Sequence, residues 1–303
     1  ITAYNVLASI FRGMGDSQSP MYFIAAACVV NIGLDFFFMG ALRLGPAGAA
    51  LGTTLSQAVS VLLALCVILK RKSIRLSKSD FCPRKATMKD ILSIGLPVAA
   101  QDGFIQVSFM LITIMANQRG LTDAAAVGIV EKIISFLFLV PSSMLSTVSA
   151  LGAQNIGAGK YDRVDDILRY AIAIGVGFGA VMALLMQFIA PSMVRPFTSD
   201  EAVVKAGASY IRSYIFDCLF AGIQFSFSGY FCAWGRSGLS FLHNTLSILL
   251  VRVPGAWLAC RFFPQTLVPM GLAPACGSLF SSIVCVLLYR WMKRQNKPTG
   301  DKD

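Results

Sequence analysis

Residues 21–41 read MYFIAAACVVNIGLDFFFMGA, and this stretch decides the class of fold. A helix needs about 20 apolar residues to cross the hydrocarbon core of a bilayer, and here Asp35 is the one charged residue in a run of that length. The whole chain has the same character, because 56% of its 303 residues are hydrophobic and 14% are charged. Soluble domains carry about a quarter charged residues. The composition therefore excludes an ordinary soluble enzyme and a disordered protein, and indicates a protein embedded in lipid.

Seven further apolar runs are long enough to span a bilayer: 47–69, 91–115, 124–150, 166–190, 203–233, 241–263 and 267–290. A shorter run, 1–11, opens the chain without a start methionine or the basic region of a signal peptide. We expect the chain to begin inside a helix. The predicted fold class is an all-α membrane protein with eight complete transmembrane helices and a partial first one.

The basic residues predict the orientation of these helices. Of the 26 Lys and Arg residues, 18 fall in loops on one side and five on the other. Basic loops face the cytoplasm, so the linker 70–90 and the C-terminal tail 292–303 are expected on the cytoplasmic side. The expected location of the protein is the inner (plasma) membrane. The net charge of +11 does not indicate nucleic-acid binding, because the basic residues flank apolar runs without interleaved aromatic residues.

Cysteine and histidine usage argues against a metal site or an enzyme. The eight cysteines lie mostly inside apolar runs and form no CxxC pair, and His243 is the single histidine. A zinc site or a disulfide framework is therefore not expected, nor is a Ser-His-Asp hydrolase. We expect a protein that is not an enzyme and holds no cofactor or metal.

An internal repeat is visible at an offset of 220 residues. Residues 8–20 (ASIFRGMGDSQSP) and 228–240 (SGYFCAWGRSGLS) share a Phe, a Gly and a Ser at equivalent positions, and two spans follow each block. Gly48 and Gly271 stand near the start of the last span of each block. A repeat of six spans predicts a parent of about 440 residues and twelve helices. The expected domains are 1–69, the end of a first six-helix lobe, the linker 70–90, and 91–291, a complete second lobe, followed by the tail.

Several motifs together resemble the multidrug and toxic compound extrusion (MATE) transporters, in particular their DinF-like branch. They are RGMGDS at 12–17, NIGLD at 31–35, GPAGAA at 45–50, GLP at 95–97 and GAQNIGAG at 152–159. The resemblance implies two six-helix lobes that open alternately to either side and export organic cations in exchange for Na⁺ or H⁺. It also implies a monomer when full length, and a chain that lacks helices one to three and most of helix four.

An ionisable residue inside a span is a functional hypothesis by default, because burying it in lipid costs several kcal/mol. Asn31 lies four residues before Asp35 and shares its helical face. Thr53 lies at the same depth in the next span. Their oxygens suit Na⁺, and the carboxylate alone suits a proton. The resembled branch has an Asn, an Asp and a Thr in this pattern, so Asn31, Asp35 and Thr53 are the predicted cation-coupling site. The alternative is that Asp35 caps or crosslinks helices.

Polar residues of the second lobe are candidates for lining a substrate cavity: Gln101, Gln106, Glu131, Asp217 and Gln224. Such groups also join helices to one another. The alternatives are that Asp217, like Asp102, lies near the membrane interface, and that Glu131 pairs with Lys132 or with water. Arg252 is expected to pair or to point inward.

Two alternatives to an antiporter stay open. A flippase for lipid-linked oligosaccharides would need a strongly cationic cavity, for which Lys132, Arg212 and Arg252 are the candidates. A chain with an incomplete first lobe would transport nothing by itself.

Overall fold

The computed structural model describes residues 2–70 and 84–295. Most of the predicted linker 70–90 and of the tail 292–303 lies outside the described residues. The chain divides into two compact units, unit 1 (Ile1–Arg84) and unit 2 (Lys85–Asp303). The described residues form helices joined by short turns and include no strand, which confirms the predicted all-α class. Within these residues, eight helices are long and apolar enough to cross a membrane.

Unit 1 contains one short helix and two long ones. These are α1 (Thr2–Gly13), α2 (Gln18–Asp35) with its π-helical continuation η1 (Phe36–Ala41), and α3 (Gly45–Lys70). A small cluster of buried side chains joins them, in which the Phe11 and Phe23 rings meet edge to face at 5.5 Å. The Tyr4 hydroxyl donates to the Pro20 carbonyl at 2.8 Å, which ties α1 to the start of α2.

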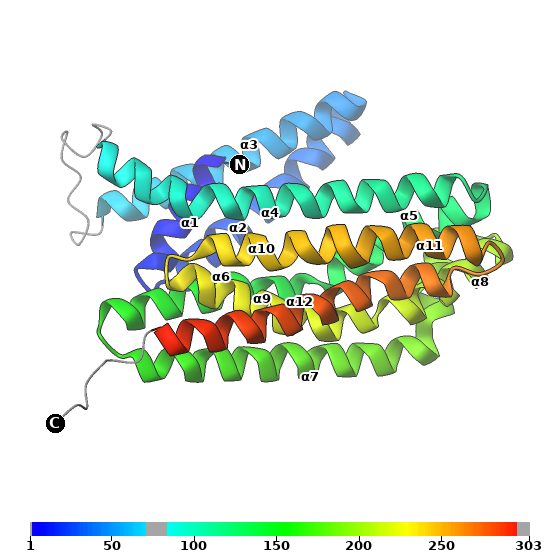
Figure 1. The fold of residues 1–303 in the computed structure, drawn as a ribbon. Coiled ribbons are helices and arrows are strands. Elements are labelled where there is room, and N and C mark those ends of the chain that lie inside the picture. Colours follow the sequence, from blue (N-terminus) through cyan, green and yellow to red (C-terminus); the bar gives the residue numbers. More distant parts are fainter. Residues whose placement is uncertain (1, 71–83, 296–303) are drawn as a thin grey trace. The chain divides into compact units, whose positions relative to one another are not determined.

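Unit 2 contains six spans, of which three are interrupted (Figure 1). Their elements are α4 (Lys85–Asn117), α5 (Leu121–Leu137), α6 (Leu139–Gly157), α7 (Tyr161–Val194), η3 (Arg195–Phe197), α8 (Glu201–Tyr214), α9 (Phe216–Ala233), α10 (Ser237–Ser247), η4 (Ile248–Arg252), α11 (Val253–Phe262) and α12 (Val268–Gln295). In Figure 1 these helices run roughly parallel, with α4 beside α10 and α11.

The spans are longer than their apolar runs predict. The run at 166–190 becomes a helix from Tyr161, because its first turn carries Asp162, and acidic residues stabilise the positive end of the helix dipole. Two predicted spans are also broken. The span 124–150 breaks at Phe138, three residues before Pro141, which has no amide N–H to donate to the Leu137 carbonyl at the end of α5. The span 203–233 breaks at Ile215, where no proline explains the interruption.

The helix α9 is the centre of unit 2, because α6, α7, α8, α10 and α12 all pack against it. Its crossing with α7 is very close. A Cβ atom on Gly222 would lie 2.6 Å from the Gly175 carbonyl carbon, and one on Gly179 would lie 2.6 Å from the Leu219 Cα. Glycines spaced four apart on α7 let the two backbones approach, as small residues commonly do between membrane helices.

The repeat seen in the sequence has a counterpart in the two turns that it contains. The Phe11 carbonyl accepts from the Asp16 amide at 2.9 Å, and the Phe231 carbonyl accepts from the Arg236 amide at 2.8 Å. Both turns contain a glycine with positive φ, +86° at Gly15 and +68° at Gly235. This is the Schellman ending of a helix, and it occurs twice at the predicted offset.

Candidate functional site

The predicted cation-coupling residues lie on α2 and α3 of unit 1. Asp35 is the last residue of α2, and the π-helical segment η1 follows it directly. Single π-helical turns inside α-helices occur frequently at functional sites. Asn31 is one turn earlier on the same helix. Both side chains are half-buried, and the Asn31 Nδ2 and Asp35 Oδ1 atoms have no hydrogen-bond partner among the described residues.

The close approach of α3 brings Asp35 near the level of Thr53. A Cβ atom on Gly52 would collide with Asp35 Oδ1, so the carboxylate lies directly against the backbone of α3. Thr53 follows Gly52 in the chain. Its side chain is exposed, and its hydroxyl donates to the Ala49 carbonyl at 3.0 Å. A cation held by all three residues would use the lone pairs of this hydroxyl, which remain available.

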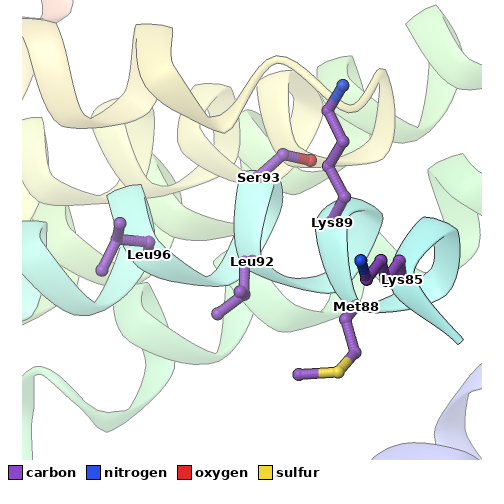
Figure 2. A pocket seen from close by; sticks show the side chains of 6 residues that line it. All are labelled: Lys85, Met88, Lys89, Leu92, Ser93 and Leu96. Carbon is purple, nitrogen blue, oxygen red and sulfur yellow. The ribbon is translucent and has the colours of Figure 1, made fainter. Parts of the chain in front are cut away.

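Asp35 also borders a hollow of about 360 Å³. The other lining residues are Ile32, Phe36, Met39 and Gly40, so the carboxylate is the charged group in an otherwise apolar wall. A larger hollow of about 520 Å³ lies on the first turns of α4 and is shown in Figure 2. Met88 and Leu92 point to one side there and Lys89 to the other, an arrangement typical of a helix that enters a membrane with its lysines reaching toward water. None of the predicted site residues lines it.

The five predicted cavity residues of unit 2 lie in different surroundings. Gln106 is exposed on α4, as is the neighbouring Asp102. Gln101 is buried, and its Oε1 accepts from the Ser240 hydroxyl at 2.6 Å. Gln224 is buried on α9 and donates through Nε2 to the Ser278 hydroxyl at 3.1 Å. These two glutamines therefore join pairs of helices.

Asp217 is 1% exposed and lies in the interior of unit 2. One expected partner is wrong. Glu131 does not pair with Lys132, whose side chain is exposed; its Oε1 accepts from the Thr113 hydroxyl of α4 at 3.0 Å. Sequence neighbours on a helix point in different directions, which is why the adjacent lysine is not the partner.

Arg252 points inward, as expected, and it brings Glu131 and Asp217 into one cluster. Its Nη2 donates to the Tyr214 hydroxyl at 2.9 Å, and its guanidinium lies 4.7 Å from the centre of the Phe109 ring. Both carboxylates lie within electrostatic reach of Arg252. We call Glu131, Asp217 and Arg252 the charged cluster.

Sequence reasoning passed over His243, which is fully buried at the centre of a crosslink between helices. Its Nε2 lies 3.0 Å from the Ser228 hydroxyl of α9, and its Nδ1 lies 2.7 Å from the Ser281 hydroxyl of α12. Its position on the polar face of α10 that also carries Ser240 and Ser247 is a signal that the sequence does contain. With both ring nitrogens engaged, His243 joins three helices.

The two ends of unit 2 are held by polar clamps. At one end Arg119 pairs with Asp123 at 2.7 Å and donates to the carbonyls of Phe263, Pro264 and Thr266, so the loop after α4 is tied to the loop before α12. At the other end Asp165 of α7 forms an ion pair with Lys293 of α12. Among residues 2–70 and 84–295 no group of three or more His, Cys, Asp or Glu side chains could hold a metal ion.

Comparison with known proteins gives a consistent match. The model of the MatE family matches residues 97–258. Among curated proteins, the chain is 29% identical over 291 residues to the probable multidrug resistance protein YpnP of Bacillus subtilis. The aligned residues are 95% of this chain and 64% of that relative. It is 26% identical over 242 residues to the multidrug export protein MepA of Staphylococcus aureus, covering 78% of the chain and 52% of that relative.

Solved structures give the same fold. A mutant of the Vibrio cholerae MATE transporter VcmN superposes with a TM-score of 0.90 at 18% identity, covering 97% of this chain and 66% of that one. An outward-facing multidrug resistance MATE transporter superposes with a TM-score of 0.89 at 22% identity, covering 96% and 66%. The chain thus spans between 52% and 66% of the length of these relatives.

Proposed function

The chain belongs to the MatE family, whose members are membrane transporters rather than enzymes, and from this premise we propose that the complete protein is a secondary antiporter. It exports organic cations in exchange for Na⁺ or H⁺ by alternating access. The names of YpnP and MepA attach multidrug resistance and multidrug export to those relatives, which supports this class of substrate. The proposed setting is the plasma membrane, with a cytoplasmic C-terminus and a monomeric protein.

Asp35 is the observation that carries the proposal. It is an ionisable group inside a span, its Oδ1 atom is buried without a hydrogen-bond partner, and Asn31 lies one turn away with an amide that also lacks one. An unpartnered carboxylate oxygen in a membrane helix costs free energy unless something binds to it. A coupling cation supplies that partner. Carboxylate, amide and hydroxyl oxygens from Asp35, Asn31 and Thr53 are hard ligands, and the carboxylate alone accepts a proton.

Exchange requires that the cation stabilise one arrangement of the two lobes more than the other, since a ligand with equal affinity for both states shifts nothing. Asp35 sits where such a preference can arise. It lies between the regular helix α2 and the π-helical segment η1, and it touches the backbone of α3. Binding or loss of a cation there changes the contact between two helices, which is a local change that a larger rearrangement can follow.

The test is efflux of a fluorescent organic cation from cells that express the complete protein, with and without a Na⁺ gradient and with a protonophore. Efflux that collapses with one gradient identifies the coupling ion. Asp35→Asn should abolish coupled efflux while leaving membrane insertion intact. Asp90→Asn is the matched control, because it makes the same chemical change at an exposed carboxylate. Normal efflux by Asp35→Asn would reject the site.

No efflux under any gradient, with insertion shown, would move the proposal to the flippase. That alternative needs a cationic cavity. Of its three candidates, Lys132 and Arg212 have exposed side chains. Arg252 is buried, but it is enclosed with two carboxylates. The one buried candidate therefore already faces two carboxylates, which supports placing the flippase second.

A further inference from the structure

The first three turns of α4, residues 85–96, stand apart from the packed core of unit 2. Every residue from 85 to 96 is exposed, and none belongs to the clusters of buried side chains that hold the unit together or packs against them. From Gln101 onward the same helix carries buried residues. We call residues 85–96 the arm of α4. Its apolar side chains are left for something other than unit 2 to cover.

Among the described residues, one hydrogen bond joins the arm to another helix. Pro97 has no amide N–H, so the Ser93 carbonyl loses its usual partner four residues further on. The hydroxyl of Ser237, which is 1% exposed at the start of α10, donates to this carbonyl at 3.2 Å. This bond fixes the arm beside the start of α10, and the rest of its surface stays open.

One face of the arm combines basic and apolar side chains. Positions 85, 88, 89, 92 and 96 recur every three or four residues, which is one side of an α-helix. With position 93 they line the hollow of about 520 Å³ (Figure 2). The two lysines, Lys85 and Lys89, lie in the first two turns, whereas Leu96 lies about 10 Å beyond Lys89 at 1.5 Å per residue. The face therefore changes from cationic to apolar along the helix, toward the interior of the membrane.

The two lysines of the arm have no carboxylate as a partner in the part of the chain that the structure describes. Asp90 is next to Lys89 in the chain, but adjacent residues on a helix point in different directions, and Asp90 points away from this face. Lys293 of α12 is a contrast, since it forms an ion pair with Asp165. The arm thus carries positive charge that calls for an anion from outside the protein.

We propose that this face of the arm binds an anionic phospholipid, with its phosphate at the two lysines and an acyl chain along Met88, Leu92 and Leu96. Basic residues immediately beside a membrane helix are typical of binding to anionic lipids. A soluble anion would leave the apolar half of the face uncovered, and a neutral lipid would leave the lysines without a counter-ion. The inference goes beyond the proposed function, because lipid binding needs neither a substrate nor an ion gradient.

Photolabelling of the purified chain in lipid nanodiscs tests the site directly. The nanodiscs consist of phosphatidylcholine with a small fraction of phosphatidylglycerol that carries a photoreactive acyl chain, and mass spectrometry identifies the labelled peptides. Phosphatidylcholine with the same photoreactive chain is the reference lipid. The anionic lipid should label residues 85–96 severalfold more than the reference lipid does. Equal labelling by both lipids would overturn the proposal, and no labelling by either would show that protein covers the arm.

Combining Lys85→Gln with Lys89→Gln removes the charge of the site. Each basic residue near a membrane surface strengthens binding to anionic lipid about fivefold, so labelling by phosphatidylglycerol should fall to the level of the reference lipid. Lys160→Gln is the matched control, because Lys160 is exposed in the turn between α6 and α7, at the end of unit 2 where α4 begins. Raising the salt to about 1 M shortens the Debye length to about 3 Å and should act on the wild-type chain like the double substitution. Labelling that survives both changes would contradict a site based on charge.

Two serine variants separate this face from general contact with the bilayer. Leu92 is 56% exposed and Ile91 is 64% exposed, but Ile91 points to another side of the helix. Leu92→Ser should therefore lower labelling by phosphatidylglycerol, and Ile91→Ser should leave it unchanged. An equal loss in both variants would show that lipid covers the arm without selecting this face, which would reject the site. Inorganic phosphate in millimolar excess should not displace the lipid, and displacement would make a soluble anion the occupant.

Discussion

The equivalent helices of the two units have the same beginning and opposite charges. The helix α2 of unit 1 and the helix α10 of unit 2 each follow a glycine turn with the same hydrogen bonds, and each passes into a π-helical segment. In unit 1 the charged residue at that segment is Asp35, and in unit 2 it is Arg252. The two copies therefore share the turn, which also ends α6 at Gly159, and differ in the sign of the charge.

The close contact with the last helix has the same arrangement in the two units. In unit 1 Gly52 of α3 makes room for Asp35. In unit 2 Gly277 of α12 makes room for Arg252, because a Cβ atom on Gly277 would lie 3.2 Å from the Arg252 Cβ. Both pairs of helices approach closely, but only unit 1 places a carboxylate in the contact.

The largest expected effect on stability comes from removing the positive charge of Arg252 in unit 2. Arg252→Met leaves buried carboxylates without their cation, and breaking a buried pair costs about 3–5 kcal/mol. Asp35→Asn should cost far less stability, because Asp35 is half-buried and borders an open hollow. The measurement is the unfolding temperature of the detergent-solubilised protein at one scan rate.

Arg212→Met is the matched control for this comparison, since the Arg212 side chain is exposed on α8. Adding Asp217→Asn to Arg252→Met should recover part of the lost stability, because one uncompensated carboxylate is then removed. Equal unfolding temperatures for Arg252→Met and Arg212→Met would show that the charged cluster does not stabilise unit 2.

An intermediate effect is expected where α3 meets Asp35. Gly52→Ala places a methyl group where the carboxylate lies, and overpacking a close contact costs about 1–3 kcal/mol. Because the atom displaced is the proposed cation ligand, coupled efflux should fall even if the protein still folds. Efflux and unfolding temperature should be measured together.

Two glycine variants show whether this loss is specific. Gly33→Ala, on α2, meets nothing within 4 Å and should leave efflux unchanged. Gly255→Ala, on α11, makes a milder contact in unit 2, 3.3 Å from the Ala273 Cβ of α12, and should affect efflux less than Gly52→Ala. If Gly255→Ala impairs efflux as strongly as Gly52→Ala, the contact with Asp35 has no special role.

The spans and the repeat could be predicted from the sequence because both depend on local patterns. Apolar length places the eight membrane-spanning helices, and the glycine turns at 15 and 235 end helices through their own backbone conformation. The break at Ile215 and the π-helical segment η1 could not be predicted, since no proline marks them. The segment η4 does have a marker, because Pro254 follows it by two residues and cannot donate to the Leu250 carbonyl.

The candidate site was predictable in unit 1 and only partly predictable in unit 2. Asn31 and Asp35 are one turn apart on one helix, so their proximity follows from spacing alone. The charged cluster joins α5, α9 and η4, which are distant in the sequence, and no single-helix pattern brings Glu131, Asp217 and Arg252 together. The helix α9 carries small and apolar residues on all sides, and this pattern in the sequence indicates that Asp217 lies in the interior of unit 2.

The smallest expected effect tests whether the two turns are equivalent. Gly15 and Gly235 have φ of +86° and +68°, and a side chain in this left-handed region costs about 1 kcal/mol or slightly more. A Cβ atom at Gly235 would meet nothing within 4 Å, so backbone strain rather than collision is the cause of the loss there. Gly15→Ala and Gly235→Ala should therefore lower the unfolding temperature by similar small amounts. Gly33→Ala is the control for the loss of a glycine from an ordinary helical position. A large loss of stability at one turn and none at the other would mean that the repeat preserves the shape of the turn but not its contribution to folding.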